Sequence, residues 1–175
     1  MTTVIVMGVS GVGKSMVAQA LAESTGWTMA EGDDFHPTAN VEKMRSGQPL
    51  DDEERWPWLR SLADWIGEQE AAGTSSVLTC SALKRSYRDL LRDGHLSVRF
   101  CQLDADTATL LERVEERKDH YMPASLLHSQ LRTLQSLGED EPGGRVNAAG
   151  DIHAVLRRVL HMLARDNPTT AGAAS

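Results

Sequence analysis

The segment GVSGVGKS, Gly8 to Ser15, carries the strongest chemical signal in the sequence. It fits the pattern G-x-x-x-x-G-K-[ST], in which glycines let the backbone N–H groups of a turn point inward at a phosphate. A helix that begins near Lys14 adds its positive dipole end. We expect Lys14 to reach the β- and γ-phosphates of a nucleotide and the Ser15 hydroxyl to be a ligand of Mg²⁺. The predicted nucleotide contacts are Gly8, Val9, Ser10, Gly11, Val12, Gly13, Lys14, Ser15 and Met16.

The alternative for this segment is a glycine-rich turn that binds no ligand. A buried strand before it and a helix after it favour the phosphate loop. The loop indicates only a nucleotide, because GTPases, ATPases and kinases share it. A GTPase is disfavoured, since the sequence has no N-K-x-D segment.

A second group of chemical residues follows in GDDFHP, Gly32 to Pro37. It stands at the carboxyl end of the second expected strand, beside the phosphate loop. Asp33 is the candidate base, because a carboxylate there can orient an acceptor hydroxyl and take its proton. Asp34 could equally form a turn or cap a helix.

The stretch from Asn40 to Leu59 mixes cationic and aromatic residues, including Lys43, Arg45 and Arg55 with two tryptophans. It reads as an insertion that forms a pocket for a polar, anionic molecule. The alternative is an ordinary solvated helix face.

Arg113 and Arg117 lie four residues apart, on one face of an expected helix that leads into a polar stretch. Arginines on a mobile lid can neutralise charge on a transferring phosphoryl group when the lid closes and excludes water. The alternative is an exposed helix with salt bridges to neighbouring glutamates.

Strands and helices alternate along the chain, which predicts an α/β fold with a parallel sheet. Expected strands are 3–7, 27–30, 76–80 and 98–103, with a weak fifth strand between Gly144 and Gly150 that suits an edge. Helices are expected after Lys14, after Pro37, around 58–66, and over 83–92, 107–117, 125–137 and 152–163. The resulting prediction is one three-layer domain over residues 1–166. It has a five-stranded parallel sheet with helices on both faces, an acceptor-binding insertion at about 37–72, a small helical lid at about 117–124 and a disordered tail at 167–175.

The composition excludes several classes of protein. With 175 residues the chain suits one domain, and a formal net charge of −7 without any Lys/Arg run argues against nucleic-acid binding. The chain begins without a signal peptide and has no long apolar stretch, so we expect a cytoplasmic protein and no membrane partner. Cys80 and Cys101 each lie in an apolar run, which predicts buried, reduced thiols.

Together, GVSGVGKS, GDDFHPTANVEKMRSGQPLDDEERWPWL and CSALKRSYRDLLR resemble the gluconokinase family of P-loop sugar-acid kinases. The resemblance runs from Val4 to about Leu134. It implies Mg²⁺-dependent transfer of a phosphoryl group from ATP to D-gluconate, giving 6-phospho-D-gluconate, by a homodimer. It also implies that Asp33, His36, Lys43, Arg55 and Arg88 lie around the sugar acid, with Lys84 also near the transferred phosphate or product. Arg113, Arg117 and His120 match the family's lid pattern R-x-x-x-R-x-x-H.

The sequence departs from the family at TLQSLGEDEPGG, where Leu137 replaces a proline. Contacts to the nucleotide base near the fifth strand are therefore not assigned. Two other functions remain open: a kinase for shikimate, adenylylsulfate or a nucleoside monophosphate, and a nucleotide-binding module without turnover.

Overall fold

A computed structural model describes residues 1–116 and 124–166. Its centre is a five-stranded sheet in the order β2-β3-β1-β4-β5, and every neighbouring pair is parallel. The strands are β1 (Thr3–Met7), β2 (Thr28–Glu31), β3 (Ser76–Thr79), β4 (Val98–Asp104) and β5 (Gly143–Asn147). The predicted parallel sheet is confirmed.

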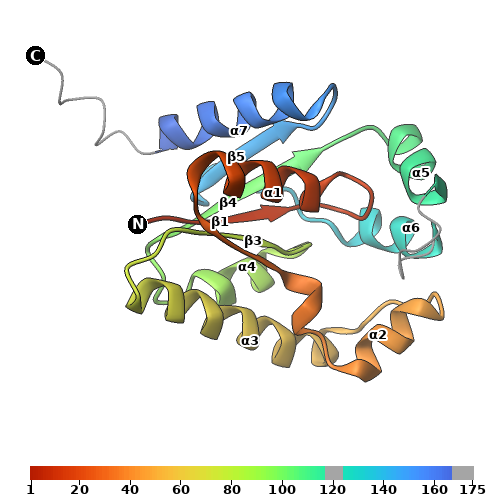
Figure 1. Ribbon diagram of the computed structural model, residues 1–175. Coiled ribbons are helices and arrows are strands. Elements are labelled where there is room, and N and C mark those ends of the chain that lie inside the picture. Colours follow the sequence, from red (N-terminus) through yellow and green to blue (C-terminus); the bar gives the residue numbers. More distant parts are fainter. Residues whose placement is uncertain (117–123, 167–175) are drawn as a thin grey trace, which may run out of the picture.

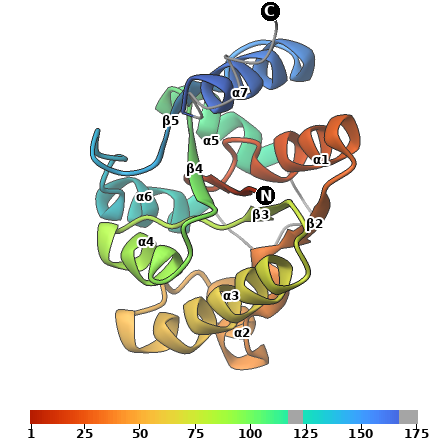
Figure 2. The same ribbon diagram turned by 90° about the vertical axis from the view of Figure 1, so that its left-hand side faces the viewer.

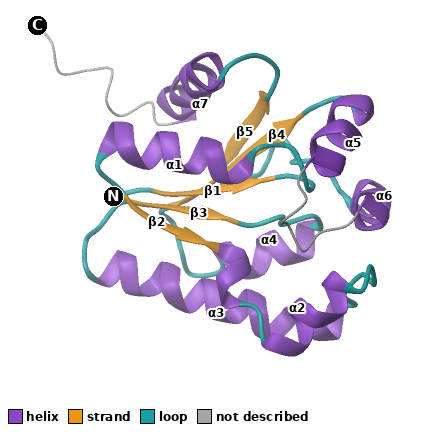
Figure 3. Ribbon diagram, turned by 45° about the vertical axis from the view of Figure 1, so that its right-hand side comes forward, coloured by secondary structure: helices purple, strands orange, loops and turns teal. Residues whose placement is uncertain are grey.

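Helices cover both faces of this sheet (Figures 1 and 2). Helices α1 and α7 pack together on one face, and α3 and α4 pack together on the other. The helices are α1 (Lys14–Thr25), α2 (Thr38–Arg45), α3 (Asp52–Ala71), α4 (Arg85–Arg92), α5 (Thr107–Glu116), α6 (Ala124–Thr133) and α7 (Ile152–Asp166), and a short 3-10 helix, η1 (Gly32–Phe35), follows β2. Figure 3 shows α2, α5 and α6 at the end of the sheet to which the strands point.

Burial explains the strand order. All five residues of β1 are buried, because β3 and β4 flank it and helices cover it above and below. In β5, only Val146 is buried, and β4 is its one partner strand among the described residues. The weak fifth strand therefore occupies the edge position that the sequence predicted for it.

Element boundaries differ from the predictions by a few residues, most clearly in α6. This helix ends at Thr133 instead of Leu137. The reason is a change of backbone partner, since the Gln135 N–H donates to the Leu83 carbonyl over 2.7 Å and so draws the chain away from the helix axis toward α4.

Helices α2 and α3 make up most of the region predicted as the acceptor-binding insertion. A reciprocal capping box fixes the start of α3: Asp51 accepts from the Glu54 N–H over 2.8 Å, and Glu54 accepts from the Asp51 N–H over 2.7 Å. Further along α3, the Trp58 indole N–H donates to the Gly32 carbonyl over 2.8 Å. This bond ties α3 to the end of β2.

The lid predicted at about 117–124 and the disordered tail predicted at 167–175 lie almost entirely outside the described residues. Within the described residues, no helix combines the length and hydrophobicity needed to span a bilayer.

Candidate active site

The phosphate loop connects β1 to α1, as its sequence requires. Gly8, Gly11 and Gly13 all have positive φ, and Gly13 precedes the first residue of α1 in the left-handed conformation. At Gly11, an added Cβ would lie 2.9 Å from the Val114 side chain and 3.1 Å from the Leu110 carbonyl oxygen of α5. Glycine is therefore needed there both for its φ and for the close approach of α5.

Two cationic side chains lie against this loop. The Lys14 ammonium donates to the Gly8 and Val9 carbonyls over 3.0 Å each, so it crosses the first turn of the loop. Arg113 of α5 reaches it from the other side, with Nη1 3.2 Å from the Val12 carbonyl oxygen. The structure thus places both predicted phosphate-side cations at the loop.

Ser15 lies beside a carboxylate that the sequence analysis did not single out. Its hydroxyl donates to Glu31 Oε2 over 3.1 Å, and the Thr79 hydroxyl donates to the same oxygen. Hydroxyl and carboxylate oxygens suit Mg²⁺, which is usually held by one or two protein groups together with water and substrate phosphates. Among the described residues, no three His, Cys, Asp or Glu side chains gather into a complete metal site. This donor set fits a magnesium ion that arrives with a nucleotide.

A cleft opens beside the loop and holds the acceptor-side residues. It contains about 700 Å³ of space, counting the part open to solvent, and its walls include Lys14 and Ser15 together with Asp33, His36 and Arg55. Asp33 comes from η1, which follows β2, and its side chain is 42% exposed. Its neighbour Asp34 is exposed and does not line the cleft.

His36 is held as a neutral imidazole. Burial lowers its pKa to about 4, an effect that nearby Asp33 opposes and Arg55 reinforces. The ring stacks on Trp58 with centroids 4.1 Å apart, and its Nε2 lies 3.9 Å from Asp33 Oδ1. At neutral pH His36 therefore offers hydrogen bonds to a ligand, but no positive charge.

Arg55 supplies the positive charge on this side of the cleft. Its Nη1 donates to the Tyr87 hydroxyl over 2.8 Å, and its guanidinium lies 5.4 Å from the centre of the Tyr87 ring. Neither contact neutralises it.

Three other predicted acceptor contacts do not line the cleft. Lys43 binds Glu54 over 2.8 Å, and Lys84 binds Asp52 over 3.0 Å. Both ammonium groups are thus neutralised by carboxylates from the first turn of α3.

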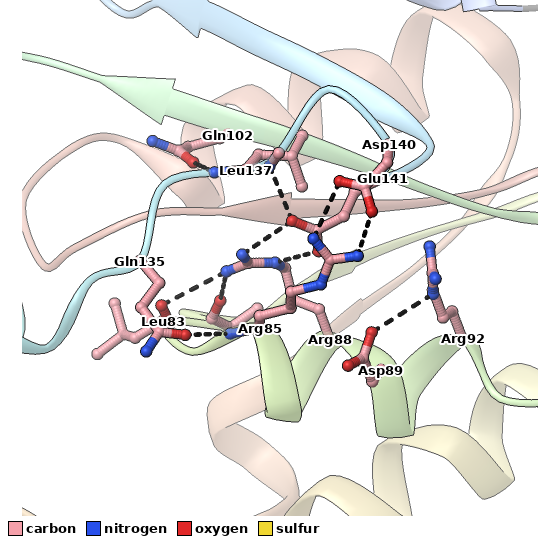
Figure 4. A network of polar contacts seen from close by, with 12 residues as sticks. Leu83, Arg85, Arg88, Asp89, Arg92, Gln102, Gln135, Leu137, Asp140 and Glu141 are labelled. Carbon is pink, nitrogen blue, oxygen red and sulfur yellow. Dashed lines mark hydrogen bonds and ion pairs between the residues drawn. The ribbon is translucent and has the colours of Figure 1, made fainter.

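Arg88 lies furthest from its predicted role (Figure 4). Its side chain is completely buried and pairs with Glu141 over 2.7 and 3.0 Å. Its Nη1 also donates to the Ala82 carbonyl over 2.9 Å, and Ala82 has the left-handed φ of 45°. With its donors occupied and no exposed surface, Arg88 braces the turn after β3 and does not touch an acceptor in the cleft.

Sequence reasoning missed three polar residues that line the cleft: Glu31, Thr79 and Gln130. Glu31 and Thr79 are the last residues of β2 and β3, where ligands of parallel sheets gather, so their strand positions could have identified them. No such signal marks Gln130, which lies on α6.

A second hollow lies on the other side of the loop. Its walls are largely apolar and come from the loop, α1, α5, the turn before α7 and the start of α7, with Val12, Met16, Ala148, Ile152 and Val155 among them. An apolar slot next to a phosphate loop suits a nucleotide base. The sequence alone assigns no base contacts near β5.

Arg117 and His120 lie outside the described residues. Cys80 and Cys101 are free and buried, as predicted, and burial raises the pKa of each thiol to about 12.

Comparison with known proteins agrees with this geometry. Residues 4–137 match the family model described as "AAA domain". A gluconokinase of Gluconobacter oxydans is 52% identical over 163 residues, which cover 93% of this chain and 92% of that protein.

Two solved structures share both sequence and fold with this chain. A sugar kinase of Janibacter sp. HTCC2649 is 47% identical with a TM-score of 0.89, covering 93% of this chain and 94% of that one. A gluconokinase of Sinorhizobium meliloti 1021 is 44% identical with a TM-score of 0.81, covering 94% of this chain and 92% of that one. From its phosphate loop, its cleft and these matches, the chain belongs to the gluconokinase family of P-loop kinases.

Proposed function

We propose that this protein transfers the γ-phosphoryl group of ATP to D-gluconate, giving ADP and 6-phospho-D-gluconate. The observation that carries the proposal is that one cleft joins the phosphate loop to Asp33, His36 and Arg55. A nucleotide on the loop and an acceptor against these three side chains would face each other across a short gap.

The charge of the cleft suits a sugar acid. The guanidinium of Arg55 can bind a carboxylate through paired hydrogen bonds. Hydroxyl groups along a polyol chain can form hydrogen bonds with His36, Ser81 and Asp33, because these side chains can donate to or accept from a neutral hydroxyl. The acceptor is therefore expected to place its carboxylate at Arg55 and its terminal hydroxyl toward the loop.

Transfer then needs alignment and neutralisation of charge. The terminal hydroxyl oxygen forms a bond to the γ-phosphorus, its proton passes to Asp33, and the bond between the γ-phosphorus and the β,γ-bridging oxygen breaks, so that ADP leaves. Lys14 and Arg113 lie where they can neutralise charge on the phosphates. Arg117 and His120 are proposed to act from the lid. Lys43 and Lys84 are proposed to reach the acceptor only by exchanging their present carboxylate partners.

Magnesium is part of the proposal. Ser15 and Glu31 are the residues that would hold it, directly or through water. The ion would neutralise charge shared by the β- and γ-phosphates.

We further propose that the protein works as a cytoplasmic homodimer, without nucleic-acid or membrane partners. The acidic net charge of −7 supports the absence of a nucleic-acid partner.

The test is an acceptor screen that measures ADP release from purified protein with ATP and Mg²⁺. Gluconate is expected to stimulate ADP release far more than shikimate, adenylylsulfate or nucleoside monophosphates do. Preference for one of those acceptors would replace gluconate as the substrate. Nucleotide binding without stimulation by any acceptor would indicate a binding module.

A further inference from the structure

Gln130 joins the phosphate loop to the acceptor cleft, although no part of the mechanism above uses it. It lies on α6, its residue is 8% exposed, and it forms part of the cleft wall. Its side-chain oxygen Oε1 accepts a hydrogen bond from the backbone N–H of Ser10 over 2.6 Å. Ser10 is the third residue of the loop and is itself buried.

This bond fixes the orientation of the amide. A backbone N–H can only donate, so the atom facing Ser10 must be the oxygen of Gln130, and the NH₂ group must occupy the other corner of the amide. The structure therefore determines which end of Gln130 faces the ligand.

The NH₂ group of Gln130 is the part of the amide that the bond to Ser10 does not use. Nε2 has no hydrogen-bond acceptor among residues 1–116 and 124–166. It is also not among the fully buried side-chain atoms that lack a hydrogen bond there. Since Gln130 lines the cleft, its two N–H donors are available to a ligand in it.

The position of this donor indicates which part of the ligand it meets. Ser10 directly follows Gly8 and Val9, whose carbonyls hold the Lys14 ammonium, and Lys14 is expected at the β- and γ-phosphates. The same cleft is also lined by Asp33 and Arg55. An amide anchored to Ser10 and facing this cleft stands at the border between phosphate and acceptor.

We propose that Gln130 is a phosphoryl-contacting residue, which donates from Nε2 to an oxygen of the γ-phosphoryl group while Oε1 stays on Ser10. The proposal rests on the kinase function proposed above. A donor fixed in advance at the transferring group stabilises its charge in the transition state without a cost of reorganisation. It also couples α6 to the occupancy of the loop by a triphosphate.

Two variants of Gln130 separate this role from a structural one. Gln130→Glu keeps an oxygen acceptor for the Ser10 N–H but replaces the donor with a negative oxygen. Gln130→Met keeps the length of the side chain and removes both polar groups. We expect kcat with gluconate to fall about 100-fold in Gln130→Met and further in Gln130→Glu.

Nucleotide affinity supplies the second measurement. The β,γ-imido analogue of ATP should bind more weakly to both variants, with the larger loss in Gln130→Glu, whereas ADP should bind within about threefold of wild type. His128→Glu adds the same charge at an exposed position of the same helix and should change neither affinity.

Two outcomes would overturn the proposal. Equal loss of affinity for ADP and for the ATP analogue would mean that Gln130 only shapes the loop. Tighter binding of both nucleotides to Gln130→Met would mean that Oε1 competes with phosphate for the Ser10 N–H. Both are equilibrium measurements, so they report on Gln130 even if the wild-type enzyme shows no turnover with gluconate, which would instead refute the proposed function.

Discussion

Internal ion pairs divide the cationic residues around the acceptor cleft into two groups. Lys43, Lys84 and Arg88 each bind a carboxylate of the protein, whereas Arg55 contacts the neutral Tyr87 hydroxyl and ring and has no ion pair with another described residue. An anionic acceptor can pair with Arg55 without breaking an existing ion pair. Arg55 is therefore the cation most available to bind an anionic acceptor, a distinction that the sequence alone does not reveal.

Arg55→Met should therefore raise the KM for gluconate by about 10- to 100-fold, the loss expected for hydrogen bonds to a charged group, with a smaller effect on kcat. Steady-state kinetics at saturating ATP would measure it. Lys43→Met should raise KM less, because Glu54 already neutralises Lys43. An unchanged KM in Arg55→Met would remove Arg55 as the carboxylate anchor.

Asp33 and Asp34 form a natural pair of test and control. Asp33 lines the cleft, and Asp34 is exposed and outside it. Asp33→Asn keeps the shape of the side chain but cannot take a proton, so kcat should fall about 10²- to 10⁴-fold while nucleotide affinity is retained. Asp34→Asn should leave kcat close to that of wild type. Full turnover in Asp33→Asn would exclude a general base there.

The neutral state of His36 makes a prediction about stability. Its pKa is about 4 in the folded chain, against 6.5 for an ordinary histidine. Between these values the unfolded chain binds a proton that the folded chain does not. The unfolding free energy should therefore be unaffected by His36 protonation above pH 6.5. It should fall by on the order of 3 kcal/mol as the pH drops from 6.5 toward 4.

Urea denaturation of wild type and His36→Gln at several pH values tests this. The difference in unfolding free energy between the two proteins should shrink as pH falls from 7 to 4, because the variant lacks the titrating group. The same substitution at an exposed histidine, His128→Gln, is measured beside it as the control. A constant difference for His36→Gln would show that the imidazole is not held neutral.

At the level of elements, the segment between α6 and β5, residues 134–142, connects α4 to strand β4. Figure 4 shows Arg85 and Arg88 of α4 facing Asp140 and Glu141 of this segment. Leu137 N–H also donates to Gln102 Oε1 of β4 over 2.7 Å. Burial alone would raise the pKa of Glu141, but hydrogen bonds from Arg88 and the Gly138 N–H outweigh it and lower that pKa.

Breaking this pair should be costly for stability. Arg88→Met leaves Glu141 buried without its cation and removes the donor to Ala82, so the unfolding free energy should fall by about 3–5 kcal/mol. The double variant Arg88→Met/Glu141→Leu should recover part of that loss, because no unpaired charge remains. Denaturant unfolding of the single and double variants measures both effects. Additive losses would mean that the two residues are not coupled.

The sequence predicted the positions of the helices and strands far better than it predicted the side-chain contacts between them. Apolar runs and glycine turns identified the first four strands, because buried parallel strands leave strong local patterns. The fifth strand was placed between Gly144 and Gly150 although its sequence has little hydrophobicity, and β5 (Gly143–Asn147) lies at the edge of the sheet. The partner of Arg88 lies 53 residues away, and no local pattern connects the two. The motif around Arg88 was therefore interpreted as an acceptor contact, whereas the fold gives that residue a structural position.

For the whole molecule, the parallel arrangement brings all of this chemistry to one edge. The carboxyl ends of β1, β2 and β3 supply the loop, Glu31 and Thr79, and α3, α5 and α6 close around them. The end of β2 can approach so closely because Gly32 lacks a side chain, since an added Cβ would lie 2.1 Å from the Thr79 carbonyl oxygen. The binding site therefore exists only when most of the sheet is folded.

A site assembled from so many elements should make ligand binding and global stability inseparable. An ATP analogue with Mg²⁺ at 100 times its Kd binds only the folded chain and should add about 2.7 kcal/mol to the unfolding free energy. For a chain of this size that corresponds to an increase in Tm of about 5–10 °C. Thermal unfolding with and without the analogue would measure it, and Lys14→Met, which lacks the phosphate-binding ammonium, should show a much smaller increase. Because unfolding that began away from the loop would still destroy the site, the whole transition should move to higher temperature as one step. A separate unfolding transition at lower temperature, with a midpoint that does not change when the ligand is added, would show that part of the sheet unfolds independently of the cleft.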